Sequence, residues 1–170
     1  MDARHAHVDS PVGPLLLVAR DDALAGLYFQ GYRYTPPPAA WGRRADVRTD
    51  RLLAQTRAEL DEYFAGQRQD FDVPAATCGD DFQERVWARL RTIPYGGRIT
   101  YGDIAAELGG KGLSQSVGQA VGRNPVSIVI PCHRVLGAGG RLTGFGGGLD
   151  RKQLLLDLEE PAEARAGRLF

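Results

Sequence analysis

The first thirty residues of the chain consist of short apolar runs separated by turn residues. Residues 15–19 and 24–29 are predominantly apolar, and the pair Asp21-Asp22 between them is typical of a tight turn. This pattern predicts a strand hairpin that opens a small sheet. Three consecutive prolines at 36–38 can continue neither a strand nor a helix, so we expect a surface loop there.

A helical pattern follows between Asp50 and Gly66. Leucine and aromatic residues recur there at intervals that place them on one face of a helix. Residues 72–81 then lose this periodicity and contain proline, glycine and paired aspartates, which is typical of a linker between structural units. We therefore predict an N-terminal α/β domain over residues 1–76 and a C-terminal domain over residues 77–170.

Three short helices are predicted after this linker. Asp81 can cap a helix whose apolar residues continue to Leu90. Thr100 and Ser114 can each cap a further helix, and the glycine-rich segment 109–112 supplies the turn between those two. Two short helices joined by a tight turn are typical of a helix-turn-helix, although many other helical hairpins share the pattern.

The apolar residues 126–130 predict a buried strand that leads directly into Pro131 and Cys132. The chain is then rich in glycine up to residue 148, and a final amphipathic helix is predicted over residues 152–160. A glycine-rich loop can hold a nucleotide phosphate, but no acidic residue completes a dinucleotide-binding pattern here. We therefore set a nucleotide-binding interpretation aside.

The composition is that of a folded globular protein. The chain has 170 residues, of which 43% are hydrophobic, which is enough for a packed core. No run approaches the roughly 18 apolar residues that a membrane helix needs, and the N-terminus lacks the apolar core of a signal peptide. We expect a soluble, cytoplasmic protein.

Charge is unevenly distributed along the chain. The formal net charge is zero, yet residues 85–152 contain ten lysines and arginines against three acids, a formal charge of +7. The neutral total argues against a nucleic-acid partner, whereas a basic middle segment is able to contact phosphates. On charge alone, a basic but merely solvated surface remains an alternative.

The two cysteines, Cys78 and Cys132, are too few for a disulfide framework and lack the spacing of a zinc site. The histidines at positions 5 and 7 have no neighbouring cysteine, and we expect no metal there. Cys78 lies in the predicted linker and is interpreted as a bystander. Cys132 precedes His133, a potential base, but adjacency alone fits a structural cysteine beside a packed histidine equally well.

The surrounding sequence favours a reactive Cys132. The run Pro-Cys-His-Arg-Val at 131–135 resembles the signature of the O6-alkylguanine-DNA alkyltransferases, also called methylated-DNA-protein-cysteine methyltransferases. The resemblance covers about half the chain strongly. It extends through residues 82–87, 93–96, 100–102, 117–118, 124–125, 147–149 and 154–159, with weaker matches at 10–15 and 63–66.

This resemblance implies an α+β fold. The N-terminal domain is expected to be a small, three-stranded antiparallel sheet with helices, of ribonuclease-H-like architecture. The C-terminal domain is expected to be a helix-turn-helix domain, winged-helix-like, that carries the active cysteine. The implied activity is DNA repair by irreversible, single-turnover transfer of the alkyl group from O6-alkylguanine, and from O4-alkylthymine, to the protein's own cysteine, with no metal or diffusible cofactor.

The family also implies roles for individual residues. Cys132 would attack the alkyl carbon, His133 would remove the thiol proton through a water molecule, Glu159 would orient the histidine, and Tyr101 would hydrogen-bond the guanine. The substrate-binding residues implied are Asn124, Val135, Phe145, Gly146 and Gly147. The DNA contacts implied are Ser114, Gln115, Ser116, Ala120, Arg123 and Arg134. A monomer would bind double-stranded DNA through the minor groove and flip the damaged base into a pocket.

Two positions depart from the family pattern. Gln115 stands where the family commonly has an arginine that fills the gap left by the flipped base, and Phe145 stands where it has a tyrosine. These departures keep open a lesion-recognition protein of the alkyltransferase-like type, although such proteins lack the reactive cysteine. A cysteine hydrolase would not explain the helix pair and the basic segment, and a transcriptional regulator would not need the Pro-Cys-His-Arg run.

Overall fold

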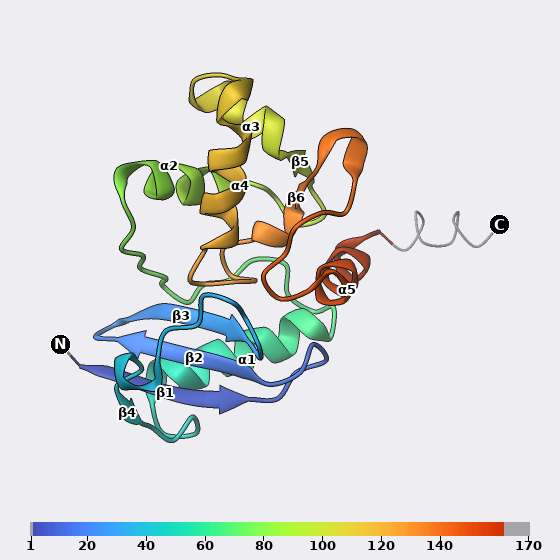
Figure 1. Ribbon diagram of the computed structural model, residues 1–170. Helices are drawn as coiled ribbons and strands as arrows, with labels where there is room; N and C mark the ends of the chain where they lie inside the picture. Colours follow the sequence, from blue (N-terminus) through green and yellow to red (C-terminus); the bar gives the residue numbers. More distant parts are fainter. Residues whose placement is uncertain (1, 162–170) are drawn as a thin grey trace.

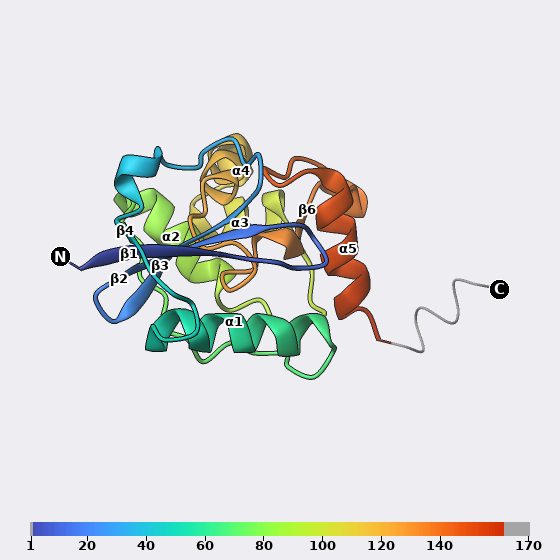
Figure 2. The same cartoon turned by 90° about the horizontal axis from the view of Figure 1, so that it is seen from below.

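A sheet backed by one helix lies beside a group of four α-helices in the computed structural model, which describes residues 2–161 (Figures 1 and 2). The α+β class is confirmed. The chain runs through the sheet first and the helical group second, so the two layers are contiguous in sequence. Short 3-10 turns occur at Pro38–Ala40, Lys111–Leu113, Cys132–Arg134 and Ala138–Gly140.

The N-terminal sheet has the strand order β3-β2-β1-β4. Strands β1 (Ala3–Val8), β2 (Leu15–Arg20) and β3 (Ala23–Phe29) pair antiparallel, and Asp21, with φ of 52°, makes the predicted turn between the last two. The expected three-stranded antiparallel sheet needs correction, because β4 (Arg43–Arg44) adds a fourth strand parallel to β1. A two-residue strand carries no periodicity, so the sequence could not reveal it.

Helix α1 (Arg51–Phe64) packs on the sheet (Figure 2). The Asp50 side chain accepts a hydrogen bond from the Leu53 backbone amide and so caps the helix at its N-terminus. The same carboxylate accepts a hydrogen bond from the buried Arg4 side chain of β1. Leu53 and Leu60 are buried, as the helical pattern predicted.

Helix α2 (Asp81–Leu90) begins the second unit. Its cap is Asp80 rather than the predicted Asp81, because Asp80 has the extended backbone of a cap while Asp81 is already helical. The Asp80 carboxylate accepts from the Gln83 amide, and the Gln83 side chain accepts from the Asp80 amide. Trp87 is buried on its inner face.

The helix-turn-helix consists of α3 (Tyr101–Leu108) and α4 (Ser114–Gly122). Thr100 caps α3 as predicted, accepting from the Asp103 amide. Ser114 does not cap α4, and that prediction is wrong. The 3-10 turn at Lys111–Leu113 runs directly into α4, so Ser114 is already helical and its hydroxyl donates to the Lys111 carbonyl at 2.7 Å.

The segment 126–130 is a buried turn and not the predicted strand. Ile128 has φ of 72°, and the Ile130 amide bonds back to the Val126 carbonyl at 2.9 Å. Only its beginning pairs with β3, where the Ser127 amide donates to the Leu27 carbonyl at 3.2 Å. The apolar run reflects burial on several sides, which a turn in the core shares with a strand.

The predicted linker is also attached to the sheet. The Leu24 amide donates to the Pro74 carbonyl at 2.8 Å, and the Ala76 amide donates to the Leu24 carbonyl at 3.0 Å. Strand β3 is therefore hydrogen-bonded to two later segments of the chain: the linker, through Leu24, and the turn 126–130 that precedes Cys132, through Leu27. The domain limits at 76 and 77 stay predictions.

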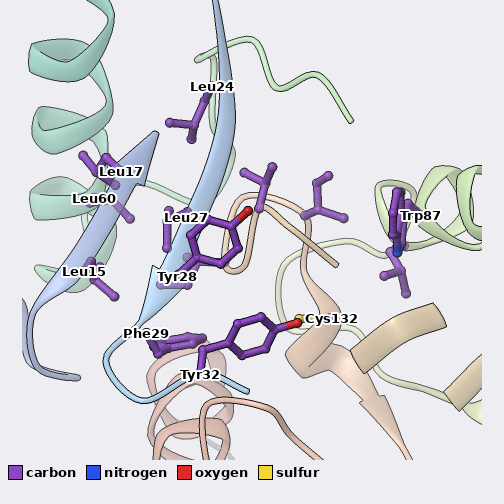
Figure 3. Packing of buried hydrophobic residues seen from close by; sticks show 14 of the residues in the cluster. Leu15, Leu17, Leu24, Leu27, Tyr28, Phe29, Tyr32, Leu60, Trp87 and Cys132 are labelled. Atoms are coloured by element: carbon purple, nitrogen blue, oxygen red, sulfur yellow. The ribbon is translucent and has the colours of Figure 1, made fainter. Parts of the chain in front are cut away.

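The last helix, α5 (Leu149–Glu159), begins at Leu149 rather than at the predicted Lys152 and lies beside the parallel pair β5 (Ile99–Thr100) and β6 (Val135–Leu136). Buried residues of both units form one core that includes Cys132 (Figure 3). Within residues 2–161, no helix is long and apolar enough to span a membrane.

Candidate active site

Cys132 begins a short 3-10 turn, and Asn124 stabilises the segment that leads into it. Asn124, which follows α4, is buried; its amide group donates to the Ile130 carbonyl at 2.8 Å and its oxygen accepts from the Val126 amide at 3.0 Å. These bonds close the turn 126–130 and fix the end of α4 against the cysteine. The position of the thiol is thus set by buried backbone, and not by a flexible loop.

The Cys132 thiol is 5% exposed. Burial raises its pKa above the ordinary value, while the side chains of Asn124 and Ser127 and the positive charge of Lys152 act in the opposite direction. A buried thiol with raised pKa is inert unless a base removes its proton.

Glu159, the last residue of α5, joins the side chains around the cysteine. Its Oε2 accepts hydrogen bonds from His133 Nε2 at 2.7 Å, the Tyr63 hydroxyl at 2.6 Å and Arg134 Nη2 at 2.9 Å. Its Oε1 accepts from Arg134 Nε at 2.8 Å. We call Cys132, His133, Arg134, Glu159 and Tyr63 the interior cluster.

The protonation states in the interior cluster follow from these contacts. The hydrogen bonds and charges of His133 and Arg134 outweigh burial and hold the pKa of Glu159 well below its usual range. Burial lowers the pKa of His133, with help from the charges of Arg134 and Lys152, so the imidazole is neutral near pH 7. An ionised Glu159 requires the proton on Nε2, which leaves the lone pair on Nδ1. No protein atom bonds to Nδ1 within the described residues.

Two further polar side chains border the cysteine. Tyr101, the first residue of α3, donates to the Gly144 carbonyl at 3.2 Å, and burial together with the nearby Cys132 raises its pKa to about 12. Its phenol is therefore a neutral donor at pH 7. Lys152 is fully buried, and its ammonium donates to the Val135 carbonyl at 2.6 Å and to the Thr143 carbonyl at 2.9 Å. Burial lowers its pKa to about 8.

The cavity beside Cys132 is nearly closed. Its volume is about 10 Å³, which is room for about one water molecule and far too little for a purine. Tyr32, from the segment after β3, points toward Cys132 (Figure 3), and its hydroxyl donates to the Gly122 carbonyl at the end of α4. Residues 144–147 line the cavity from the other side. A large ligand can enter only if one of these walls moves.

A much wider depression lies outside this cavity, and we call it the outer hollow. Its volume is about 750 Å³. One wall is α4, a second is the loop 143–146 with Tyr101, and the third comes from the N-terminal sheet unit. The lining residues are Arg33, Tyr34, Tyr101, Ser114, Gln115, Gly118, Gln119, Gly122, Thr143, Gly144, Phe145 and Gly146.

The residues predicted for substrate and DNA binding divide between these two places. Phe145 and Gly146 line both the cavity and the outer hollow, and Gly147 lines the cavity alone. Val135 is buried behind the cysteine. Ser114 and Gln115 line the outer hollow, and Gln115, Ser116 and Arg123 are exposed.

Two predicted DNA contacts conflict with the structure. Arg134 is 6% exposed, and its guanidinium is bonded to Glu159 and to the Ile93 carbonyl. Ala120 is 3% exposed and faces α2, whose Trp87 donates to its carbonyl at 2.8 Å. Their positions in the sequence suggested DNA contact, but the packing turns both side chains toward the protein interior. Neither residue is included in the proposed DNA-binding surface.

The basic segment is also less available than its charge suggested. Arg134 and Lys152 are buried, Arg89 pairs with Glu107, and Arg151 donates to backbone carbonyls. The cations that remain exposed are Arg85, Arg91, Arg98, Lys111, Arg123 and Arg141.

Sequence reasoning missed three residues of the site. Tyr63 was assigned only to a helix face, Tyr32 was given no role, and Lys152 was counted among surface cations. Tyr32 and Tyr63 contact the site across 90 and 96 residues of chain, so no local pattern could have revealed them. Lys152 is closer to its partners in the chain, but its burial comes from the tertiary packing. For Tyr63 alone there was a partial signal, because residues 63–66 match the family's N-terminal part. That match did not indicate the hydrogen bond from Tyr63 to Glu159.

The fold and the site together define a class: a protein that joins a helix-turn-helix to a buried cysteine, which is followed by a buried histidine hydrogen-bonded to a glutamate. A family model for the ribonuclease-like domain of 6-O-methylguanine DNA methyltransferase matches residues 3–77. A model for the DNA-binding domain of the same enzyme matches residues 81–161. The chain belongs to the O6-methylguanine DNA methyltransferase family.

Individual relatives cover nearly the whole chain. The methylated-DNA–protein-cysteine methyltransferase of Mycolicibacterium paratuberculosis is 47% identical over 163 residues, which is 96% of each chain. A crystal structure of Mycobacterium tuberculosis O6-methylguanine methyltransferase matches with a TM-score of 0.81 and 40% identity, covering 96% of this chain and 98% of that one. A Mycobacterium tuberculosis OGT solved in complex with DNA matches with a TM-score of 0.83 and 42% identity, covering 92% of each chain.

Proposed function

We propose that this protein repairs DNA by transferring the alkyl group of O6-alkylguanine to Cys132. The observation that carries the proposal is the interior cluster, in which a buried thiol lies beside a neutral imidazole whose Nε2 is held by an ionised Glu159. The substrate class follows from membership of the O6-methylguanine DNA methyltransferase family. Activity on O4-alkylthymine remains a prediction.

The transfer is a direct displacement. The Cys132 sulfur forms a bond to the alkyl carbon while the bond from that carbon to guanine O6 breaks, and the electron pair stays on the base. The product is a thioether on Cys132, and no group in the interior cluster can hydrolyse it. One protein molecule therefore repairs one base.

His133 and Glu159 supply the base for this step. His133 Nδ1, which has no protein partner among the described residues, takes the thiol proton through one water molecule. Glu159 then stabilises the imidazolium through the bond to Nε2. The Tyr101 hydroxyl, a neutral donor, hydrogen-bonds the departing guanine and limits the charge that develops on it.

Delivery of the base is the second requirement. The target lies inside a duplex, so the nucleotide must leave the stack at a cost of a few kcal/mol, and α4 is proposed to enter the minor groove to extrude it. The exposed face of α4 is built from small and polar residues, which permits close approach to DNA. The closed cavity requires Tyr32 or the loop 144–147 to move as the base enters. A monomeric state and a cytoplasmic location stay predictions.

A lesion-recognition protein without efficient transfer is the second candidate, and the observation that favours it is the departure of Gln115 and Phe145 from the family pattern. A duplex bearing one O6-methylguanine distinguishes the two functions. The protein is incubated with this duplex, and its peptides are mapped by mass spectrometry. Transfer gives one added methyl group on Cys132, in amounts equal to the repaired guanine.

The matched controls use the two cysteines of the chain. Cys132→Ala abolishes transfer, whereas Cys78→Ala, which removes the exposed thiol, leaves it intact. Tight lesion binding with an unmodified Cys132 would establish the recognition function instead.

A further inference from the structure

The chain that follows β3 in the N-terminal unit lies against the end of α4 (Figures 1 and 2). Tyr32 is 7% exposed, and its hydroxyl donates to the Gly122 carbonyl. Its ring also packs on Gly146, where an added Cβ would come within 2.2 Å of it. Residues 32–34 are therefore held at the helix that is proposed to bind DNA.

An aromatic ring between two cations follows in this segment. The Arg123 guanidinium lies 4.2 Å from the centre of the Tyr34 ring, and the Arg33 guanidinium lies 5.3 Å from it. Both arginines are exposed. Within residues 2–161, neither guanidinium pairs with an acidic side chain or forms a hydrogen bond, so both cations beside the Tyr34 ring lack a counter-charge. Such an arrangement favours an anion that contacts both.

Apart from Arg33, the residues that line the outer hollow carry no charged side chain. Helix α4, with the sequence SQSVGQAVG, carries no charged side chain, and Gln115 brings none to the position where an arginine was expected. Arg33 and Tyr34 line the outer hollow together with Ser114 and Gln115. A DNA backbone that follows α4 toward its C-terminal end passes the edge formed by the N-terminal unit.

We infer that the N-terminal unit contributes directly to DNA binding, with the Arg33 guanidinium contacting a DNA phosphate beside Arg123. This inference rests on the proposed function and adds to it a contact outside the helix-turn-helix. Tyr34 holds both guanidiniums in place by stacking, and Tyr32 fixes the segment to α4. The cation absent from α4 is thereby supplied by the other unit of the protein.

The experiment measures the salt dependence of binding to an undamaged duplex by fluorescence anisotropy. Each phosphate contact adds about 0.9 to the slope of log affinity against log salt concentration. Arg33→Gln is expected to lower the slope by about 0.9 and to weaken binding about fivefold at 0.15 M salt. Arg33→Gln with Arg123→Gln is expected to lower the slope by about 1.8.

Arg57→Gln is the matched control. Arg57 is exposed on α1, in the same unit, and its replacement makes the same change in net charge. Its slope should equal that of the unchanged protein. Thermal unfolding of each variant checks that these exposed substitutions leave the fold intact.

Two results would overturn the inference. One is a slope for Arg33→Gln equal to that of the unchanged protein, and the other is an equal loss in Arg57→Gln, which would reflect net charge alone. Methylation of Cys132 in the unchanged protein is measured separately. A protein that methylates Cys132 but shows no effect at Arg33 disproves only the DNA contact, whereas a protein that never methylates Cys132 disproves the proposed function.

Discussion

The interior cluster and the outer hollow lie on either side of the segment Phe145–Gly147, yet they are built in opposite ways. In the interior cluster, every oxygen of Glu159 is hydrogen-bonded and Tyr63, His133 and Arg134 are buried. In the outer hollow, polar residues of α4 are exposed, and Arg33 has no acidic partner among the described residues; the same is true of Arg123 beside it, which contacts the Tyr34 ring.

The difference shows which part of the reaction the folded protein prepares in advance. Buried groups held by several hydrogen bonds have one geometry, so the thiol, imidazole and carboxylate are in place before any DNA arrives. An exposed surface with unpaired cations gains its partners only on binding. The two regions should therefore respond differently to mutation: the interior cluster through the free energy of unfolding, and the outer hollow through DNA affinity and its salt dependence.

The strongest test of the comparison is Glu159→Gln. Loss of the carboxylate leaves the buried Arg134 without its counter-charge, so the free energy of unfolding should fall by about 3–5 kcal/mol. Glu107→Gln is the matched control, because its partner Arg89 is partly exposed, and it should cost at most about 1 kcal/mol. Urea unfolding measures both variants. Equal losses of unfolding free energy in the two variants would show that burial does not make the ion pair of the interior cluster more important for stability than the exposed pair.

Tyr63→Phe tests whether the N-terminal unit supports the carboxylate. It removes one buried donor to Glu159 and should cost about 1.5–3 kcal/mol of stability, because hydrogen bonds to charged groups lie in that range. The control is Tyr28→Phe, since the Tyr28 hydroxyl is partly buried yet forms no hydrogen bond within residues 2–161. A loss of stability in Tyr28→Phe as large as in Tyr63→Phe would assign the effect to packing.

The pH dependence of stability follows from His133. Its pKa is lowered in the folded protein, so below the ordinary value of about 6.5 the unfolded chain binds the extra proton first. The free energy of unfolding should therefore decrease as pH falls below about 6.5, by at most about 1.4 kcal/mol per pH unit for this group. The lowered pKa of Glu159 adds a further loss below about 4.3.

The contribution of His133 is measured by difference. Urea unfolding of the unchanged protein and of His133→Asn is compared from pH 8 to pH 5. The variant should show a shallower decline than the unchanged protein. Parallel curves would mean that His133 has the same pKa in the folded and the unfolded chain.

The smallest effect is expected at the outer hollow. Gln115→Arg adds a cation to α4 and should raise affinity for a duplex about fivefold at 0.15 M salt, with no change in unfolding free energy. The gain should disappear near 1 M salt. A gain that persists at high salt would indicate a contact with bases rather than phosphates, and a change in stability would contradict the separation of the two regions.

Much of the fold could be predicted because many of its helices and strands depend on local sequence patterns. The hairpin around Asp21, helix α1 between Asp50 and Gly66, and the helix pair that begins at Thr100 all follow from residues close together in the chain. Errors arose where burial came from several directions at once. The segment 126–130 is apolar because it is a turn inside the core, and β4 is too short to have a period.

In the candidate site, the cysteine and its glutamate could be predicted from the sequence, whereas the side chains that surround them could not. Pro131 to Val135 marked the cysteine by resemblance, and Glu159 followed from the same comparison. Arg134 was placed on DNA, although its side chain is directed at Glu159, and the sequence has no signal for that direction. Tyr32 lies 90 residues before its partner Gly122, and Tyr63 lies 96 residues before Glu159.

The amino-acid sequence by itself determined which chemical groups this protein has and that a strand hairpin, helix α1 and the helix pair after Thr100 would form, because those depend on neighbours in the chain. Only the tertiary structure decided which groups meet. It turned Arg134 and Lys152 inward, brought Tyr63 to the carboxylate, closed the cavity over Cys132 and left Arg33 exposed near the end of α4. The reason is physical: burial and long-range contact set the pKa, accessibility and partners of a side chain, and packing alone fixes them.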